Sequence, residues 1–462
     1  MDPTPNYRRS LKVYRGMSLF SALLVAASIS IGGTARGMQD STSDVSSKPI
    51  GEAKRWFEDA RLGLHIHWGL DSLLGKGASV MEREKLPIEQ YEKLLGRFTA
   101  TRFNAESWVL LAKAAGANYL SVDAKRPDGF CLFDSKLTPF DATGATPYAR
   151  DPLKDLAEAC RKHQIRLFLN YSVLDWHHPD YFPRGKTGRS AGRPDQGEWP
   201  RYLAYYQGQI RELCTKYGEI GGIRLEGFWD RPDADWDLAS TYRIIRELQP
   251  GALIGIDPRT HRFEGADFWF SDQSSAGMAE LLVKNVEGRS SRPGESGLPI
   301  AVSENHAPRN APLHPLVHLL RGLLDRAGEG TNTLLVVNAS PDGAIAAEPV
   351  ERLKELGNRL KIIGPAFYKT RKGPIPPASW GVSLAEGSSS RPTGIFLHVD
   401  PAKLKTPLVL PMGFEFFNAT LLGNEIPLMM KQVAGGFELQ IPEGVRTEID
   451  TVVILRPTML DR

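Results

Sequence analysis

Residues 221–230 read Gly-Gly-Ile-Arg-Leu-Glu-Gly-Phe-Trp-Asp. The apolar residues before Glu226 predict a short buried strand, and Gly227 directly behind it ends that strand. In barrel enzymes the catalytic groups lie at the C-terminal ends of the strands, and aromatic residues beside a carboxylate are typical of sugar sites. Glu226 is therefore a candidate catalytic residue. An acid that pairs with an arginine in a strand-to-helix loop is the structural alternative, and this stretch alone leaves the two even.

Seven other runs have the same strand-like character, and helical patterns lie between several of them. The eight predicted strands are residues 63–69, 118–125, 166–171, 222–226, 252–257, 267–271, 299–303 and 333–338. Apolar residues recur at helical spacing in residues 105–116, 152–163, 202–217, 316–326 and 348–363. This alternation predicts an α/β fold, a (β/α)8 barrel over residues 51–365, with weak helices between the fifth and seventh strands.

The sequence pattern changes after residue 364. Short strand-like runs follow around Val382 and at residues 395–399, 408–410, 414–417, 437–441 and 452–455, with Gly and Pro between them. This pattern predicts a small C-terminal β-sandwich over residues 366–462. It carries no catalytic constellation, and we expect it to brace the barrel or the substrate entrance.

The N-terminus has the pattern of an export signal. Four basic residues lie between Arg8 and Arg15, residues 17–31 are apolar and uncharged, and Gly-Thr-Ala follows at 33–35. As a helix the apolar run spans about 22 Å, short of the roughly 30 Å hydrocarbon core, so a membrane anchor is the less favoured alternative. We expect a cleaved signal peptide over residues 1–35, a flexible linker over 36–50, and an exported protein with no membrane span after signal removal.

Composition restricts the partners and cofactors. The chain has 462 residues with a net charge of +3, 41% apolar and 24% charged, so charge implies neither nucleic acid nor a membrane surface as a partner. Cys131, Cys160 and Cys214 match no zinc-binding spacing, and buried free thiols are expected. No cofactor is predicted, and the oligomeric state is left open.

Polar and aromatic residues cluster where the predicted strands end. They are His65, His67, Trp68, Asp123, Lys125, Arg126, Asp128, Asn170, Tyr171, Glu226, Trp229, Asp230, Asp257, Arg259, Asp272, Glu304, His306 and Asn338. Two carboxyl groups on such a rim can hydrolyse a glycoside without a metal. His65 and His67 point to the same side of one strand and suggest metal-assisted hydrolysis instead, but the later strands lack the further histidines that such a site needs. No metal is therefore predicted.

Several longer motifs resemble family 29 glycoside hydrolases, the α-L-fucosidases. Residues 56–69 read Trp-Phe-x-x-Ala-Arg-Leu-Gly-Leu-His-Ile-His-Trp-Gly, and residues 330–343 look like the family's eighth-strand signature. Further similarity lies at residues 84–91, 112–119, 124–130 and 171–181. The resemblance covers about residues 50–370. It implies a barrel followed by a β-sandwich, a carbohydrate substrate and no cofactor.

The resemblance also assigns roles. Glu226 matches the family's aspartate nucleophile, and Asp272 is nearest to its glutamate acid, with Glu304 as the alternative acid. His67, Tyr171 and Arg259 match sugar contacts, while Trp68, Asp123, Arg126, Trp229 and Asp257 are further candidates for substrate binding. The family's paired histidines after the second strand are replaced by Arg126 and Pro127, and its Glu-Trp pair by Ala78 and Ser79.

These replacements change the expected chemistry. Glu for Asp moves the carboxylate by about 1.5 Å, the length of one bond between sp³ carbons. An arginine fork favours carboxylates or sulfates, so a sugar with an acidic substituent is one hypothesis. We also expect Arg224 to pair with a carboxylate near Glu226. A retaining glycosidase of altered specificity, an inactive sugar-binding protein on the same scaffold and an ordinary fucosidase stay open.

Overall fold

The computed structural model describes residues 44–77, 79–257, 259, 264–271, 292–302, 311–404, 407–411 and 418–457. The expected signal peptide and the strand predicted at 414–417 lie outside these residues and stay predictions. No helix among the described residues is long and apolar enough to cross a membrane.

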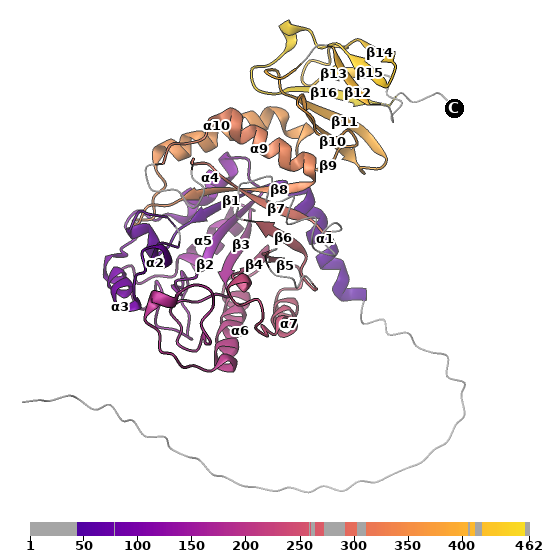
Figure 1. The fold of residues 1–462 in the computed structure, drawn as a ribbon. Helices are drawn as coiled ribbons and strands as arrows, with labels where there is room; N and C mark the ends of the chain where they lie inside the picture. The colour runs from indigo at the N-terminus through magenta and orange to yellow at the C-terminus, as the bar shows by residue number, and fades with distance from the viewer. Residues whose placement is uncertain are drawn as a thin grey trace, which may run out of the picture. The chain divides into compact units, whose positions relative to one another are not determined.

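Eight parallel strands close into a barrel in chain order, with β8 paired to β1 (Figure 1). The strands are β1 Leu62–His67, β2 Tyr119–Lys125, β3 Arg166–Ser172, β4 Gly222–Glu226, β5 Leu253–Ile256, β6 Phe268–Ser271, β7 Gly294–Pro299 and β8 Thr331–Asn338. Buried parallel strands are apolar on both faces, which explains why most were visible as apolar runs. The predicted (β/α)8 barrel is confirmed.

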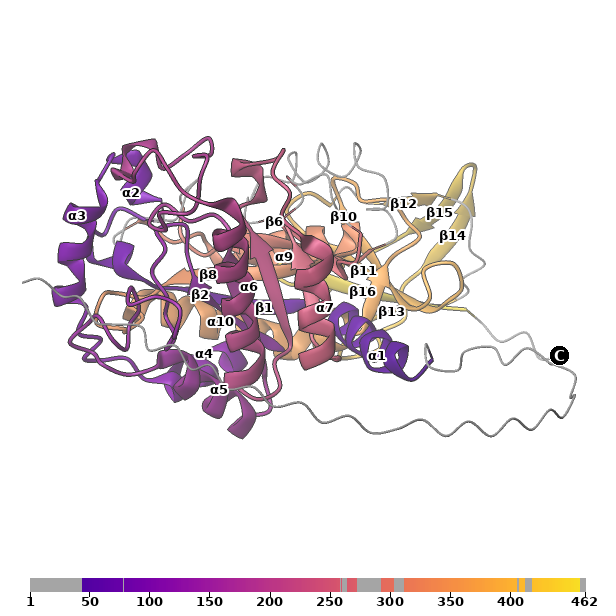
Figure 2. The ribbon, with the colours of Figure 1, turned by 90° about the horizontal axis from the view of Figure 1, so that it is seen from below.

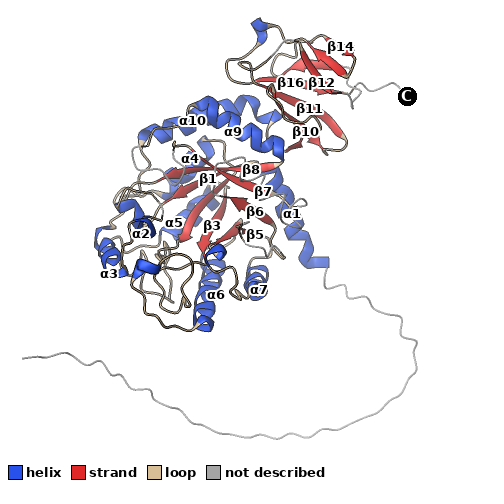
Figure 3. Ribbon diagram, viewed as in Figure 1, coloured by secondary structure: helices blue, strands red, loops and turns tan. Residues whose placement is uncertain are grey.

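Helices surround the strands, as the separation of red strands from blue helices shows in Figure 3. They are α1 Asp44–Ala60, α2 Val80–Arg83, α3 Ile88–Tyr91, α4 Ala105–Ala114, α5 Pro152–Lys162, α6 Trp199–Lys216, α7 Leu238–Leu248, α9 Leu316–Glu329 and α10 Ala347–Ile363. Helices α6 and α7 run side by side (Figure 2). The Asn104 side chain accepts a hydrogen bond from Ser107 N at 2.8 Å and caps α4. Gly116, with φ of +84°, follows that helix.

Helix α1 closes the N-terminal end of the barrel. Phe57 packs against Phe268, Tyr119 and Phe168, with ring centroids 4.6, 5.7 and 6.0 Å apart. These three rings belong to residues in the first half of their strands. Because α1 begins at Asp44, residues 44–50 of the predicted linker are helical.

The seventh strand differs from its prediction. It spans Gly294–Pro299, ahead of the predicted 299–303. Its first residues are Gly-Glu-Ser-Gly, which lack the apolar character of the other strands. Glycine is required at 294, since a Cβ there would lie 2.2 Å from the Trp269 ring. Glu295 is tolerated inside the barrel because Arg224 and Tyr119 contact its carboxylate.

The C-terminal strands form two antiparallel sheets. The order is β13-β16-β11-β10-β9 in one and β12-β15-β14 in the other. The strands are β9 Thr370–Lys372, β10 Gly381–Gly387, β11 Pro392–Val399, β12 Leu408–Pro411, β13 Asn418–Leu421, β14 Met430–Val433, β15 Gly436–Leu439 and β16 Thr451–Arg456. Apolar side chains of both sheets, such as Leu397, Leu410 and Val453, share one core. The predicted β-sandwich is confirmed.

Candidate active site

A bulge in β2 determines which side chains face the centre of the rim. The register of β2 on β3 shifts between Asp123 and Lys125. Alternation would turn both side chains inward, but the extra residue re-aims Lys125. Lys125 instead pairs with Asp175 at 2.8 Å, with both side chains almost fully buried. Arg126 then returns to the site, where it contacts Asp123.

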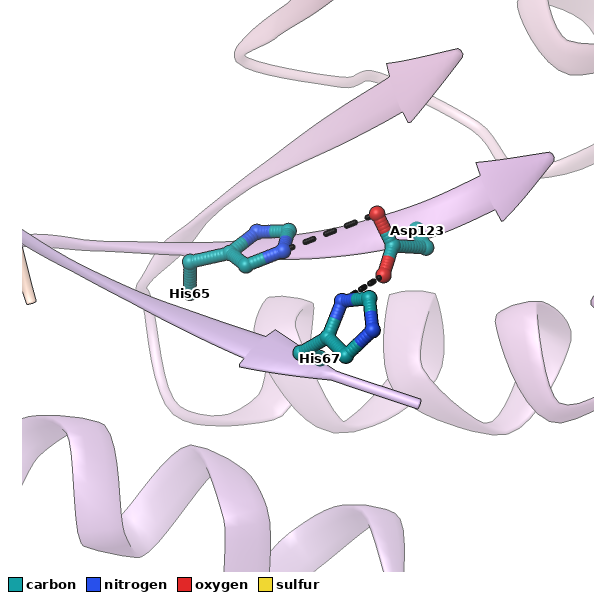
Figure 4. A group of neighbouring side chains, drawn as sticks. All are labelled: His65, His67 and Asp123. Atoms are coloured by element: carbon teal, nitrogen blue, oxygen red, sulfur yellow. Dashed lines mark ion pairs between the residues drawn. The ribbon is translucent and has the colours of Figure 1, made fainter. Parts of the chain in front are cut away.

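Asp123 contacts two histidines of β1. Figure 4 shows His65 and His67 turned toward its carboxylate from β1. His67 Nδ1 lies 2.8 Å from Asp123 Oδ2, and His65 Nε2 lies 3.6 Å from Asp123 Oδ1. Asn170 Nδ2 donates a hydrogen bond to Asp123 Oδ1 at 3.0 Å. Both carboxylate oxygens of Asp123 are thus engaged.

Arg126 and Asp71 complete a group that we call the rim cluster, made of His67, Asp71, Asp123 and Arg126. Arg126 Nη1 lies 3.1 Å from Asp123 Oδ2 and 2.6 Å from His67 Nδ1. Asp71 Oδ2 lies 3.1 Å from His67 Nε2 and 3.6 Å from Arg126 Nη2. All four residues are buried. The cluster therefore balances two cationic side chains against two carboxylates.

The pKa values follow from this arrangement. Burial and Arg126 each lower the pKa of His67, but the carboxylates of Asp123 and Asp71 outweigh them and raise it to about 9. Burial raises the pKa of Asp71, yet Arg126 and His67 hold it well below its ordinary value. Two contacts compete at His67 Nδ1. A protonated ring donates to Asp123, whereas a neutral ring accepts from Arg126. The raised pKa favours the protonated ring at neutral pH.

One subset of these side chains could ligate a metal ion. His65, His67 and Asp123 offer ligand atoms within 4.8 Å of one another. The guanidinium of Arg126, however, already lies against donor atoms of His67 and Asp123. A permanent cation at this position competes with a divalent ion for the same donors. The geometry therefore favours an ion-paired cluster over a metal centre.

Glu226 ends β4, which β3 separates from β2 in the barrel. Its backbone carbonyl accepts a hydrogen bond from Val173 N at 2.8 Å, which anchors the strand end. Burial lowers the pKa of Arg126, but the carboxylates of Asp71, Asp123, Asp128 and Glu226 raise it above its ordinary value. Arg126 and Glu226 therefore lie within electrostatic range of each other.

The β4 and β5 ends hold the remaining described candidates. Asp257 is buried, and its two oxygens accept from Arg259 Nε at 3.0 and 2.9 Å. The Arg259 guanidinium lies 4.9 Å from the centre of the Trp229 ring. Trp229 is only half-buried and follows Glu226 by three residues. Asp257 thus holds the Arg259 guanidinium beside the Trp229 ring.

Two predicted substrate contacts face away from the rim, and the structure corrects them. Trp68 is 1% exposed and packs among Phe98, Phe103 and Trp108, with ring centroids 4.9, 5.1 and 5.4 Å away. The Tyr171 side chain points out of the barrel, because it alternates with the inward-facing Asn170. It is fully buried there against the helix layer. Its hydroxyl donates to Gln209 Oε1 on α6 at 2.7 Å.

Arg224 pairs with a different carboxylate from the one we expected near Glu226. Its Nε lies 3.0 Å from Glu295 Oε1, and the Tyr119 hydroxyl donates to Glu295 Oε2 at 2.6 Å. We call Tyr119, Arg224 and Glu295 the interior cluster. It lies within the strands, whereas the rim cluster lies at their C-terminal ends.

The loop after β3 is held together by hydrogen bonds and ring stacking. Asp175 Oδ1 accepts from the backbone N–H groups of His177 and His178 at 2.9 and 2.7 Å. The His177 ring stacks on Phe140 with centroids 4.0 Å apart. Burial raises the pKa of Asp175, but Lys125 outweighs it and lowers the pKa to about 2. All three cysteines are buried and unpaired, as expected.

Sequence reasoning missed Asp71 and did not pair Asn170 with Asp123. Asp71 follows the end of β1 by four residues and lies in the 3-10 helix Leu70–Leu73. Its distance from the strand end hid it, although a carboxylate four residues beyond His67 was visible in the sequence. The predicted acids Asp272 and Glu304 lie outside the described residues, and so does His306.

A cleft opens beside the rim cluster. Asp71, Ser79, Arg126, Asp128 and Trp176 are among its lining residues, and its volume is about 10 Å³, room for about one water-sized group. Asp128 Oδ2 accepts from the Tyr91 hydroxyl at 2.7 Å and Asp128 Oδ1 from Phe130 N at 3.0 Å. Burial raises the pKa of Asp128 to about 6. The cleft wall thus combines acidic and cationic groups.

Comparisons with known proteins agree with this architecture. The α-L-fucosidase family model matches residues 33–365. The tissue α-L-fucosidase of Bos taurus is 30% identical over 357 residues, which cover 71% of this chain and 70% of the relative. The plasma α-L-fucosidase of Homo sapiens is 26% identical over 341 residues, covering 68% and 69%.

Solved structures give the same result. α-L-Fucosidase isoenzyme 1 from Paenibacillus thiaminolyticus superposes with a TM-score of 0.76 at 26% identity, covering 88% of this chain and 99% of that chain. An α-L-fucosidase from Bacteroides thetaiotaomicron shares the fold, with a TM-score of 0.75 at 22% identity over 92% and 97%. The chain with its Glu226 rim therefore belongs to the α-L-fucosidase family of glycoside hydrolases.

Proposed function

We propose that the protein removes a terminal sugar of the α-L-fucoside type, with Glu226 as the nucleophile, and that the rim cluster alters its sugar specificity. The observation that carries this proposal is the position of Glu226 at the C-terminal end of β4, within electrostatic range of Arg126. Barrel enzymes use carboxylates at such strand ends for catalysis. Family membership supports the same reaction class.

The reaction we propose has two steps. The ionised carboxylate of Glu226 attacks the anomeric carbon while a carboxylic acid protonates the leaving oxygen. Water then hydrolyses the glycosyl-enzyme, with the second carboxyl group acting as base. Asp272 is the proposed acid, and Glu304 is the alternative. Arg126 supplies positive charge within electrostatic range of Glu226, and its contacts with His67, Asp71 and Asp123 hold the guanidinium in place.

The rim cluster argues against a sugar with an acidic substituent. The charge of Arg126 is already shared among Asp71, Asp123, Asp128 and Glu226. An acidic substituent bound beside Arg126 would lie among these four carboxyl groups, while Arg126 and His67 are the two cations of the cluster. Coulomb repulsion therefore favours a neutral or cationic sugar. Altered specificity in this proposal means a changed pattern of hydrogen bonds to the sugar.

Hydrolysis of 4-nitrophenyl α-L-fucopyranoside tests the proposal. We expect measurable turnover by the wild type and a loss of at least about a thousandfold in kcat for Glu226→Gln, since removal of a nucleophile removes the covalent route. Azide should restore turnover to Glu226→Ala and yield a glycosyl azide of inverted configuration, because a small anion fits where the carboxylate was removed.

Two results would contradict this function. One is an inert wild type across a panel of aryl glycosides. The other is a Glu226→Gln variant that is as active as the wild type. If the inert protein still bound methyl α-L-fucopyranoside, the alternative of a sugar-binding protein without catalysis would replace the proposal. The matched control is Glu219→Gln, which changes a carboxylate of the same kind in the loop before β4.

A further inference from the structure

The cleft beside the rim cluster contains a buried acceptor whose bonds are incomplete. Asp71 is 3% exposed, and its Oδ2 lies against His67 and Arg126. Among the residues that the structure describes, Asp71 Oδ1 has no hydrogen-bond partner. Buried carboxylate oxygens are almost always satisfied, and one that lines a cleft calls for a donor from outside the chain.

Other carboxylates of the same rim differ from Asp71. Asp128 lines the same cleft, and Tyr91 and Phe130 satisfy its two oxygens. Both oxygens of Asp123 are engaged as well. Of the two carboxylates that line this cleft, Asp71 is therefore the one with an unsatisfied oxygen among the described residues.

A second acceptor lies nearby without a donor. Asn170 is 5% exposed, and its Nδ2 donates to Asp123, while its Oδ1 has no partner among the described part of the chain. Asp123 links the two acceptors. It contacts Asn170 directly, and it contacts His67, which in turn contacts Asp71. A ligand that presents hydrogen-bond donors would complete this side of the rim, whereas an anionic group would face acceptor oxygens without protons.

We propose that Asp71 is a specificity-determining residue whose Oδ1 accepts a hydrogen bond from one hydroxyl or protonated amino group of the bound sugar. This inference rests on the proposed function, because it assumes that a bound sugar directs one hydroxyl or amino group into the cleft. A site built around a donor rejects an analogue without it, since the acceptor then stays buried and unpaired. Asp71 thereby selects a sugar by the presence and position of one donor, and it rejects a sulfate or carboxylate there.

Calorimetric binding of methyl α-L-fucopyranoside and of its 2-, 3- and 4-deoxy derivatives tests this contact in the full-length protein. We expect one of the three deoxy derivatives to bind the wild type at least about tenfold more weakly than the parent. In Asp71→Asn that preference should shrink to within about twofold, so that the two changes are not additive. The amino-deoxy derivative at the same position should bind as well as the parent, and the sulfate ester more weakly than the deoxy compound.

Asp128→Asn is the matched control, because it changes a satisfied carboxylate in the same cleft. We expect it to keep the discrimination between parent and deoxy sugar. Asp71→Glu provides a second variant if Asp71→Asn folds poorly, since it keeps the charge beside His67 and moves the acceptor by about 1.5 Å. It too should lose the discrimination, and a thermal unfolding scan establishes that each variant is folded.

The contact would be overturned if no single hydroxyl mattered to the wild type, if Asp71→Asn kept the full preference, or if no methyl fucoside bound. Tighter binding of the sulfate ester would also overturn it. Failure of the proposed function is a separate result. A protein that binds with the expected pattern but hydrolyses no aryl fucoside keeps the Asp71 contact, and one that hydrolyses it without a preference dependent on Asp71 loses only that contact.

Discussion

The rim cluster and the interior cluster are both buried ion pairs within one barrel, yet they differ in how their acceptors are used. In the interior cluster Glu295 directs one oxygen at Arg224 and the other at the Tyr119 hydroxyl. In the rim cluster Asp71 directs Oδ2 at His67 and Arg126, and its Oδ1 has no hydrogen-bond partner among the residues that the structure describes. The interior cluster has the form of a structural pair, whereas the rim cluster borders a cleft that is open to groups from outside the chain.

The difference teaches how to separate structural from functional charges when both are buried. Burial alone does not distinguish them, because Arg224 and Asp71 are both under 4% exposed. The position along the strand and the surroundings do, since Glu295 lies against Arg224 and Tyr119 within the strands, whereas Asp71 lines a cleft at the rim. Substitutions should therefore lower stability in the interior cluster and change catalysis or binding in the rim cluster.

Glu295→Gln should have the largest effect. It leaves the buried guanidinium of Arg224 without its carboxylate, and breaking a buried pair from one side costs about 3–5 kcal/mol. Urea unfolding measures the loss of free energy of unfolding. The kcat/KM of the folded protein should stay within about twofold of the wild type, because the interior cluster does not reach the rim. The double variant Arg224→Met/Glu295→Leu should recover most of the stability, as apolar replacements of buried pairs often do.

The comparison would break if Glu295→Gln left stability unchanged and reduced kcat/KM instead. In that case the interior cluster would act on the chemistry, and the distinction drawn from position along the strand would fail.

Arg126→Met should have the next largest effect, and it should fall on catalysis. Loss of the guanidinium leaves Asp71, Asp123 and Glu226 without their shared cation. Removal of one electrostatic group from an active site costs about a hundredfold in rate, which corresponds to about 2.7 kcal/mol. Kinetics with the aryl fucoside should show kcat/KM lower by about that factor, and Arg126→Lys should restore part of it.

Arg150→Met is the control for this substitution. Arg150 also pairs with an aspartate, Asp155, but its side chain is 62% exposed. We expect no change in kcat/KM there. Wild-type kinetics in Arg126→Met would show that the rim cluster is structural and that its resemblance to a binding site is misleading.

The sequence predicted the barrel because buried parallel strands leave continuous apolar runs. It missed the position of β7, since Gly294 and Glu295 carry no such signal and their fit depends on Trp269 and Arg224 on other strands. That information is tertiary, and no local pattern contains it. The same limit explains why the partner of Arg224 was not identified, since Glu295 lies 71 residues further along the chain.

The candidate site was predictable to the extent that its residues end strands. His67, Asp123, Arg126 and Glu226 were identified in this way. Tyr171 was misplaced because strand alternation turns it toward α6, and Asp71 escaped because a 3-10 helix brings it back to the rim.

A buried pair in the β-sandwich gives the smallest expected effect and tests the comparison away from the barrel. His398 Nδ1 lies 2.8 Å from Asp450 Oδ2, and its Nε2 lies 3.0 Å from the Ala366 carbonyl oxygen. Burial lowers the pKa of His398, but Asp450 outweighs it and raises the pKa above the ordinary value. The pair therefore contributes its full stabilisation below about pH 6.5, the unfolded value, and loses it as the pH rises through the folded pKa.

We expect His398→Gln to be less stable than the wild type by about 1.5 kcal/mol at pH 6, with a gap that narrows toward pH 9. Urea unfolding across this range measures the gap, and Asp450→Asn should show the same trend. A stability gap that widened with pH would mean that the buried His398 ring is neutral. A change in kcat/KM would mean that a buried pair far from the rim also affects catalysis, against the comparison.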